Sequence, residues 1–410
     1  MKTSRTLLWY ALSSSVLSWL VGGFEVALIL RFRNSLVDVL VLQMVAFLML
    51  FLGFRLAGRW LRHGNASGLF RLGSFLQAAA CGSLALAVPW AHSPLFLGPF
   101  FLLRGLADGV FAGGRSVTLL ALVGDRDRDP WVLQLQALAV GLGLLLPPAA
   151  GAVIGWGGPG AGTIPAGYLI LAGVAGTWAL VCGFLAPRLE IPAQDIGWEG
   201  WIRLFRRPDH RPWLTLLAVG CLSGVTASLA VSSLNVAVVG GEWGLGLLAA
   251  WAAFLSGVFF WGLHRFARTT TLKRLRWTGA GSAGEFVSRL VYAVWPTLPG
   301  LGFRSLLDNF VVPFRGLLGE NIVRRQLERA AQAEGLSLAQ VQYFQESVIL
   351  LFRLGVSLVL ILVLAWVGAD SQKTCRLLLV ACLPLGVVEF LLLRTLDHRH
   401  RDPIPGPVSP

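Results

Sequence analysis

Apolar runs of about 20 residues follow one another along the chain, separated by short polar segments. A helix of this length crosses the roughly 30 Å hydrocarbon core of a bilayer. The pattern therefore predicts an all-α polytopic membrane protein with about 12 transmembrane helices. The predicted spans are residues 8–30, 36–57, 69–90, 95–121, 131–156, 167–187, 213–236, 244–263, 278–297, 301–319, 344–367 and 375–394.

The polar segments divide these spans into two sets of six. Residues 1–187 are the predicted N-terminal half, 188–212 a central cytoplasmic loop and 213–396 the C-terminal half. The Pro-rich tail, 397–410, is predicted to be disordered. Residues 320–343 have apolar positions at helical spacing, so a helix lying on the membrane surface and a solvated connector both fit this segment.

Basic residues gather in alternate connections between the spans. One set contains Arg59, Arg62, Arg126, Arg128, Arg203, Arg206, Arg207, Arg211, Arg265, Arg268, Lys273, Arg274, Arg276, Arg324, Arg325 and Arg329. The other connections, around 91–94, 157–166, 237–243 and 298–300, contain no Lys or Arg. The exceptions are Arg31, Arg33, Lys373 and Arg376. Cytoplasmic loops are enriched in Lys and Arg, so both termini are predicted to be cytoplasmic, in a bacterial inner or plasma membrane.

Composition excludes several classes of function. Only 13% of the residues are charged and the mean hydropathy is +0.69, whereas a soluble domain has about a quarter charged residues. The net charge of +13 does not predict nucleic-acid binding, because the basic residues form no single patch with interleaved aromatics. The five cysteines lack CxxC spacing, and no HExxH, nucleophile elbow or phosphate-binding loop occurs. We therefore predict no enzyme, metal site or cofactor.

An Arg-x3-Asp-x6-Arg pattern occurs twice, in the fourth span and in the tenth. It comprises Arg104, Asp108 and Arg115 in the first half and Arg304, Asp308 and Arg315 in the second. The offset is 200 residues, and the pattern falls on the same ordinal helix of each half. A transporter built from two structural repeats places its substrate site between them, near the membrane midplane.

These intramembrane charges have two interpretations. A charge at a helix centre costs about 2.5–3.5 kcal/mol, so it normally faces a partner or a watery cavity. Arg104 and Asp108 are four residues apart, as are Arg304 and Asp308, so each pair can neutralise itself and stabilise the bundle. Alternatively, the arginines bind an anionic or polar substrate and the acids exchange protons. Glu285 and Arg289, also four apart in the ninth span, are secondary candidates for either role.

Glu25 differs from these pairs. It lies late in the first span, after Gly22 and Gly23, with no basic residue within one helical turn on the inner side. A lone membrane carboxyl is typical of a group that titrates. The alternative is that Glu25 extends to the outer interface, toward Arg31 or Arg33.

Twelve spans in two halves, with cytoplasmic termini and a long central loop, resemble the major facilitator superfamily. Residues Gly143–Ala152 resemble the Gly-x3-Gly-Pro-x2-Gly-Gly antiporter motif of its proton-coupled exporters, with Pro147 and Ala152 where that family has Gly. Arg104 resembles the arginine that the family uses for proton coupling, although the expected Gly is displaced to Gly109.

The loop after the second span, residues 53–64, is similar in place and basicity to the family's gating loop. Its usual Asp is absent, and Ala57 stands nearest to that place. The candidates for gating are Arg59 and Arg62 in this loop together with Arg115 and Arg315.

The resemblance implies a secondary active transporter that works by alternating access. The antiporter-like motif favours proton-coupled export of a small molecule that is anionic or amphipathic, by a monomer in the lipid bilayer. Two alternatives remain open at this point. One is a flippase of the same fold for a lipid or lipid-linked headgroup, and the other is a non-transporting receptor or assembly partner.

Overall fold

The computed structural model describes residues 2–33, 35–87, 94–122, 125–156, 165–186, 188–189, 191, 201–266, 271–310, 312–367 and 371–399. The first part contains α1 (Lys2–Leu20), η1 (Gly22–Phe24), α2 (Glu25–Arg33), α3 (Leu36–Leu61), α4 (Ala66–Ala87), η3 (Pro94–Leu97), α5 (Gly98–Leu122), α6 (Asp125–Trp156) and α7 (Ala166–Leu185). Two short helices follow, α8 (Trp201–Arg206) and η4 (Pro208–His210).

The second part contains α9 (Arg211–Val239), α10 (Glu242–Phe266), α11 (Thr271–Val294), α12 (Leu298–Phe310), α13 (Val312–Glu334), α14 (Leu338–Val367), α15 (Ser371–Ala381) and α16 (Leu383–Arg399). Apart from α8 and η4, we group consecutive helices of one crossing into rods: α1 with η1 and α2, η3 with α5, α12 with α13, and α15 with α16. The described residues then form 12 rods, six before α8 and six after it.

The length and hydropathy of these helices are those of a membrane protein. Eight helical segments of the described chain are long and apolar enough to cross a bilayer. The other four rods contain the intramembrane charges or breaks, which lower their mean hydropathy. The predicted fold class, an all-α polytopic membrane protein, is confirmed.

Three predicted spans are divided between helices, and one of these, 301–319, is shared by α12 and α13. The first, expected as one helix over 8–30, ends its first helix at Leu20 and continues as α2 after a 3-10 turn at Gly22–Phe24. Adjacent glycines favour such a break because they lose the most conformational freedom in a helix. The last span breaks at Cys382, where Pro384 cannot donate the next helical hydrogen bond. The final helix extends to Arg399, into the predicted tail, and residues 400–410 lie outside the described part.

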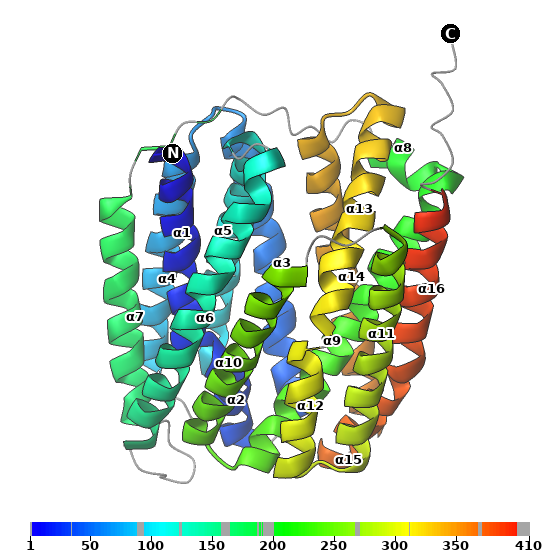
Figure 1. Cartoon of the computed structure of the whole chain (residues 1–410). Coiled ribbons are helices and arrows are strands. Elements are labelled where there is room, and N and C mark those ends of the chain that lie inside the picture. The colour runs from blue at the N-terminus through cyan, green and yellow to red at the C-terminus, as the bar shows by residue number, and fades with distance from the viewer. Residues whose placement is uncertain are drawn as a thin grey trace.

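Residues 320–334 form neither a surface helix nor a connector. They are part of α13, which stands upright in the bundle (Figure 1). Leu327, Ala330 and Ala331 are buried in one hydrophobic cluster with Phe344 of α14. This burial explains the apolar spacing that the sequence shows there. In the predicted central loop, 188–212, the described residues include α8 and η4, and residues 192–200 lie outside them.

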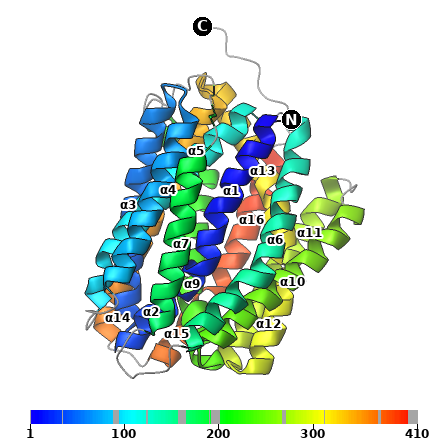
Figure 2. The same ribbon diagram turned by 90° about the vertical axis from the view of Figure 1, so that its left-hand side faces the viewer.

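The rods form one bundle in which the first six and the last six are largely side by side (Figure 1). The start of α1 and the end of α16 lie at the same end of the bundle in both views (Figures 1 and 2). The two sets meet along several helix pairs, which include α6 with α10, α3 with α14 and α2 with α9. The boundaries of the two predicted halves stay predictions.

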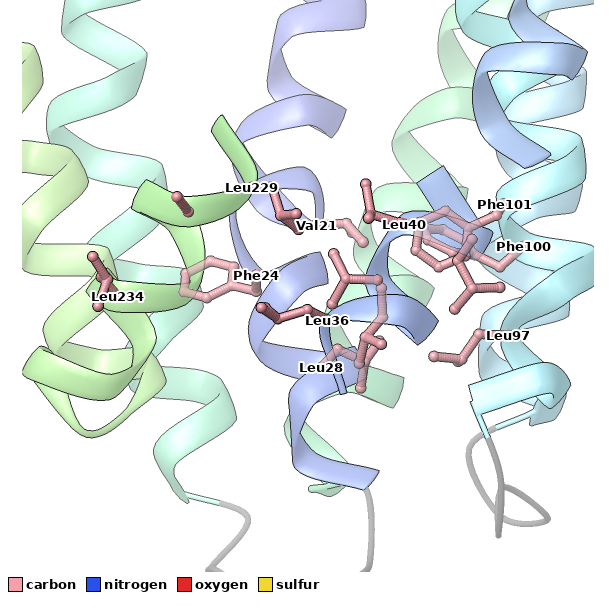
Figure 3. Packing of buried hydrophobic residues seen from close by; sticks show 14 of the residues in the cluster. Val21, Phe24, Leu28, Leu36, Leu40, Leu97, Phe100, Phe101, Leu229 and Leu234 are labelled. Atoms are coloured by element: carbon pink, nitrogen blue, oxygen red, sulfur yellow. The ribbon is translucent and has the colours of Figure 1, made fainter. Parts of the chain in front are cut away.

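The two sets contact one another at both ends of the bundle. At the end that carries α8, Tyr343 of α14 donates a hydrogen bond to the carbonyl oxygen of Phe54 in α3, at 2.5 Å, and its ring stacks on the Phe54 ring. At the opposite end, Phe24 points from η1 toward α9, where Leu229 and Leu234 lie (Figure 3). Both contacts close the bundle between its two sets of rods.

A stripe of glycines fixes the rotation of α5. Gly105, Gly109 and Gly113 recur every four residues and face α3. A Cβ atom at Gly109 would collide with the carbonyl oxygen of Leu50, so the two backbones are in direct contact, as in small-xxx-small packing of membrane helices. Arg104 and Asp108 each precede one of these glycines, and this packing turns them toward the neighbouring helices α2 and α4.

Gly109→Ala should therefore destabilise the protein. The methyl group forces α5 away from α3, and overpacking of this kind typically costs about 1–3 kcal/mol. The control is Gly82→Ala in α4, because a Cβ atom there meets nothing within 4 Å. Both changes give the same gain in helix propensity. Thermal unfolding of the purified proteins should show a lower Tm for Gly109→Ala only, and equal Tm values would contradict the close contact.

Candidate functional site

Arg104 lies between two carboxylates on different helices. It forms an ion pair with Glu25 of α2 and another with Asp108, one turn further along α5, at 3.5 Å from Nε to Oδ2. Gln77 of α4 donates a hydrogen bond to Oδ1 of Asp108, at 3.5 Å. The guanidinium also lies 5.9 Å from the centre of the Phe100 ring. The sequence predicted the pair within α5 but not the contacts from α2 and α4.

The structure gives Glu25 a partner that neither interpretation of the sequence included, and titration of Glu25 stays a prediction. Glu25 is neither isolated nor directed to the outer interface, because it pairs with Arg104. The 3-10 break before it places its carboxylate in the first turn of α2, where the helix dipole also favours negative charge. A search for partners within one helical turn could not find an arginine on another rod.

A small cavity adjoins this group. Its volume is about 30 Å³, and its lining residues are Val21, Gln77, Ala80, Cys81, Phe100, Arg104 and Asp108. A water molecule needs at least about 10–15 Å³ of such space and two or more polar partners, which Gln77, Arg104 and Asp108 supply. The cavity therefore fits water and not a metabolite, and its lining comes only from the first six rods.

The second half of the chain has a matching group around Arg304. The guanidinium pairs with Asp308 at 2.6 Å, donates to Asn235 of α9 at 3.4 Å and lies 5.1 Å from the centre of the Tyr292 ring. The hydroxyl of Ser288 donates to Asp308, and that of Tyr292 donates to Asn235 at 2.9 Å. These partners all belong to the last six rods, and Arg304 does not line the cavity beside Arg104.

The two groups correspond beyond the motif itself. Glu25 in the first rod takes the place of Asn235 in the seventh, and Gln77 in the third rod that of Ser288 in the ninth. One position differs in charge, since Glu25 is an acid and Asn235 is an amide. The group around Arg104 therefore has two carboxylates for one guanidinium, whereas the Arg304–Asp308 pair is balanced.

Glu285 and Arg289 form an ion pair on α11, in the last six rods. Like the Arg304–Asp308 pair, it has one carboxylate for one guanidinium. Arg289 donates to the hydroxyl of Ser223 in α9, at 2.9 Å, and to the carbonyl oxygen of Cys382, at 3.4 Å. Cys382 lies at the break between α15 and α16, and its carbonyl oxygen also accepts a backbone hydrogen bond from Leu385 at 3.2 Å. This geometry favours the structural interpretation of the pair, which holds three helices together at a helix break.

The gating candidates lie near the end of the bundle that carries α8. Arg59, Arg62 and Arg115 are exposed, and Arg59 and Arg62 flank the contact between Tyr343 and α3. The side chain of Arg315 lies outside the described residues. Gating by these residues stays a prediction.

Sequence reasoning missed Gln77, Asn235, Ser288 and Tyr292, although their polarity within predicted spans was a signal. It also missed Arg353, which lies in the middle of the eleventh span. In the part of the chain that the structure describes, no three His, Cys, Asp or Glu side chains form a group that could hold a metal ion.

The sequence matches no protein-family model and no curated protein. The structure is similar to the crystal structure of a D-xylose–proton symporter, with a TM-score of 0.67 and 11% identity over 96% of this chain and 95% of that one. The chain has the major facilitator fold. A bacterial homologue of the iron transporter ferroportin, in an inward-facing state, gives a TM-score of 0.62 and 15% identity over 97% and 98% of the two chains.

A bacterial homologue of the human lysosomal transporter Spinster, inward-facing and unoccupied, gives a TM-score of 0.64 and 14% identity over 97% of each chain. The predicted resemblance to the major facilitator superfamily is thus confirmed at the level of the fold. Sequence identities of 11–15% are too low to infer the substrate of this protein from its structural neighbours. Its chemistry must be inferred from its own residues.

The balanced pair of the second half should behave as a structural unit. Asp308→Asn leaves Arg304 without its carboxylate, and removing one partner of a buried pair typically costs about 3–5 kcal/mol. Arg304→Gln combined with Asp308→Asn should recover part of that loss. Thermal unfolding of the two single variants and the double variant measures the coupling, which we expect to be about 0.5–3 kcal/mol. Strictly additive losses would contradict the pairing.

Proposed function

We propose that this protein is a proton-coupled secondary active transporter that exports a small molecule by alternating access. The observation that carries the proposal is the charge imbalance around Arg104, where Glu25 and Asp108 share one guanidinium. Secondary transporters of other substrates share the fold, which supports transport but leaves the coupling to be argued from the site.

A single proton balances this group. With both acids ionised the group carries one uncompensated negative charge, which is costly among membrane helices. A proton on Glu25 or Asp108 leaves one carboxylate for one guanidinium, so the group has a neutral state and a charged state. The adjoining cavity is large enough for one water molecule, and its polar lining supplies the hydrogen-bond partners. This water delivers the proton.

The position of Glu25 links the proton to a conformational change. Glu25 follows Phe24 directly, and Phe24 forms the contact with α9 at the end of the bundle opposite α8 (Figure 3). Protonation of Glu25 weakens its pair with Arg104 and so releases α2 from α5. The movement of α2 carries Phe24 away from α9 and opens this end of the bundle, as alternating access requires.

Export is supported by the helix that carries the antiporter-like motif. Residues Gly143–Ala152 of α6 pack against α10, and a Cβ atom at Gly151 would lie 2.5 Å from the carbonyl oxygen of Glu242. Close packing of this kind lets the two sets of rods slide or seal against each other at the end opposite α8. The D-xylose–proton symporter has the same fold, so the direction of transport depends on this helix pair and not on the fold.

Glu25→Gln and Asp108→Asn test the coupling, since each amide keeps the size of the side chain but cannot titrate. Infrared difference spectra over a pH titration should show a carboxyl band that disappears in one of the two variants. In proteoliposomes, that variant should still exchange substrate without a gradient but lose accumulation driven by a pH gradient, by about tenfold or more.

Glu328→Gln is the control, because Glu328 is an exposed acid paired with Arg324 on α13. It should change neither the carboxyl band nor uphill transport. A band that persists in both amide variants, with wild-type accumulation, would show that the proton binds elsewhere.

The orientation is tested by cysteine labelling in intact cells. We expect Arg206→Cys on α8 to react only with membrane-permeant reagents, because the basic connections indicate a cytoplasmic α8. Thr297→Cys, exposed between α11 and α12 at the opposite end, should react with impermeant maleimide from outside. The reverse pattern would place both termini outside the cytoplasm.

A further inference from the structure

Arg353 lies where the two sets of rods meet. It is near the middle of α14, and its guanidinium lies 5.7 Å from the centre of the Phe47 ring of α3. It also interacts with the thiol of Cys221 in α9, which donates a hydrogen bond to the carbonyl oxygen of Ile349 in α14. Arg353 therefore contacts the first six rods through α3 and the last six through α9, whereas Arg104 and Arg304 each contact only one set.

Unlike Arg104, Arg289 and Arg304, Arg353 has no carboxylate four residues away on its own helix. Arg104, Arg289 and Arg304 each pair with a carboxylate four residues away on the same helix. Among the residues that the structure describes, no carboxylate lies within ion-pairing distance of Arg353. A guanidinium without an ion-pair partner inside a spanning helix is costly, and such groups mark substrate or ion pathways in membrane proteins.

Glu346 does not take the place of that acid. It lies two turns before Arg353 on α14, and the two side chains interact electrostatically without forming an ion pair. Its carboxylate accepts a hydrogen bond from Gln342 at 3.0 Å and is also within electrostatic reach of Arg115. Glu346 is thus held toward the α8 end of the bundle, and the guanidinium of Arg353 keeps its donors for another group.

A second donor lies on the same face of α14. Ser357 follows Arg353 by four residues, so the two positions are neighbours on the helix surface. Ser357 is fully buried, and its hydroxyl has no hydrogen-bond partner among the described residues. A buried hydroxyl without a partner needs an explanation, and a ligand beside Arg353 provides one.

We propose that Arg353 and Ser357 bind an anionic group, a carboxylate or a phosphate, on the molecule that this protein transports. The planar guanidinium and the hydroxyl match the oxygen atoms of such a group. The Phe47 ring supplies an apolar surface for the attached body of an amphipathic molecule. The proposal rests on the transport function proposed above and gives the substrate its chemical class.

The same location makes the ligand sensitive to the conformational change. A ligand held by Arg353 contacts α14 together with α3 and α9, and these helices move relative to one another when either end of the bundle opens. Such a ligand binds the closed and open states with different affinity, which is the requirement for coupling binding to transport.

Binding is measured on the full-length protein in nanodiscs of phosphatidylcholine. The probes are benzoate and phenyl phosphate, each with a neutral counterpart of similar shape, benzamide and benzyl alcohol. Tm is recorded against probe concentration for the wild type, Arg353→Gln, Arg353→Lys and Ser357→Ala. The matched control is Arg324→Gln, which removes a half-buried arginine that pairs with Glu328 on α13.

We expect an anionic probe to raise the Tm of the wild type and of Arg324→Gln, and the neutral probes to leave it unchanged. Arg353→Gln should weaken anion binding by about tenfold or more, and Arg353→Lys by less because it keeps the charge. Ser357→Ala should weaken binding several-fold, and it tests the site even where Arg353→Gln does not fold.

A second arm distinguishes a soluble anion from a lipid headgroup. If only phosphatidylglycerol, added to the nanodiscs, raises the Tm in an Arg353-dependent way, the anionic group belongs to a lipid. The proposal is overturned if no anion raises the Tm, or if the wild type and the Arg353 and Ser357 variants respond alike. No pH gradient is present in this experiment, so its failure would leave the proton coupling of Glu25 and Asp108 to its own test.

Discussion

The guanidinium of Arg104 forms ion pairs with two carboxylates, so its single positive charge balances only one of them. The helices α2, α4 and α5 pack around this group. The carboxylates come from different rods, Asp108 from the same helix and Glu25 from α2. Water would screen such a group, but among membrane helices its charge must be balanced by a proton or by a change of partners. The corresponding group around Arg304 has Asn235 in place of the second acid and carries no such imbalance.

The backbone around this group follows from two local features of the sequence. Glycines at every fourth position hold α5 against α3 and leave Arg104 and Asp108 facing α2 and α4. The break at Gly22–Phe24 then brings Glu25 to Arg104 while Phe24 contacts α9. One short turn thus connects a titratable group to a contact between the two sets of rods, which is the physical basis for linking proton binding to opening.

The intramembrane arginines divide according to their partners. Arg289 and Arg304 are balanced by acids on their own helices, so their main contribution is to hold the last six rods together. Arg353 lacks such an acid and lies between α3, α9 and α14. The unbalanced charges of opposite sign, the acids near Arg104 and the guanidinium of Arg353, are the ones to which we assign the proposed proton coupling and substrate binding.

The sequence by itself determined the fold class and the ion pairs between residues four apart on the same helix. Hydrocarbon thickness dictates the length of each apolar run, and helical spacing alone brings Arg104 to Asp108 and Arg304 to Asp308. Partners on other rods depend on how helices rotate and where they break, which local patterns do not specify. Only the tertiary structure therefore paired Glu25 with Arg104, joined residues 320–334 to α13, and showed Arg353 to be a half-buried cation with no ion pair among the described residues.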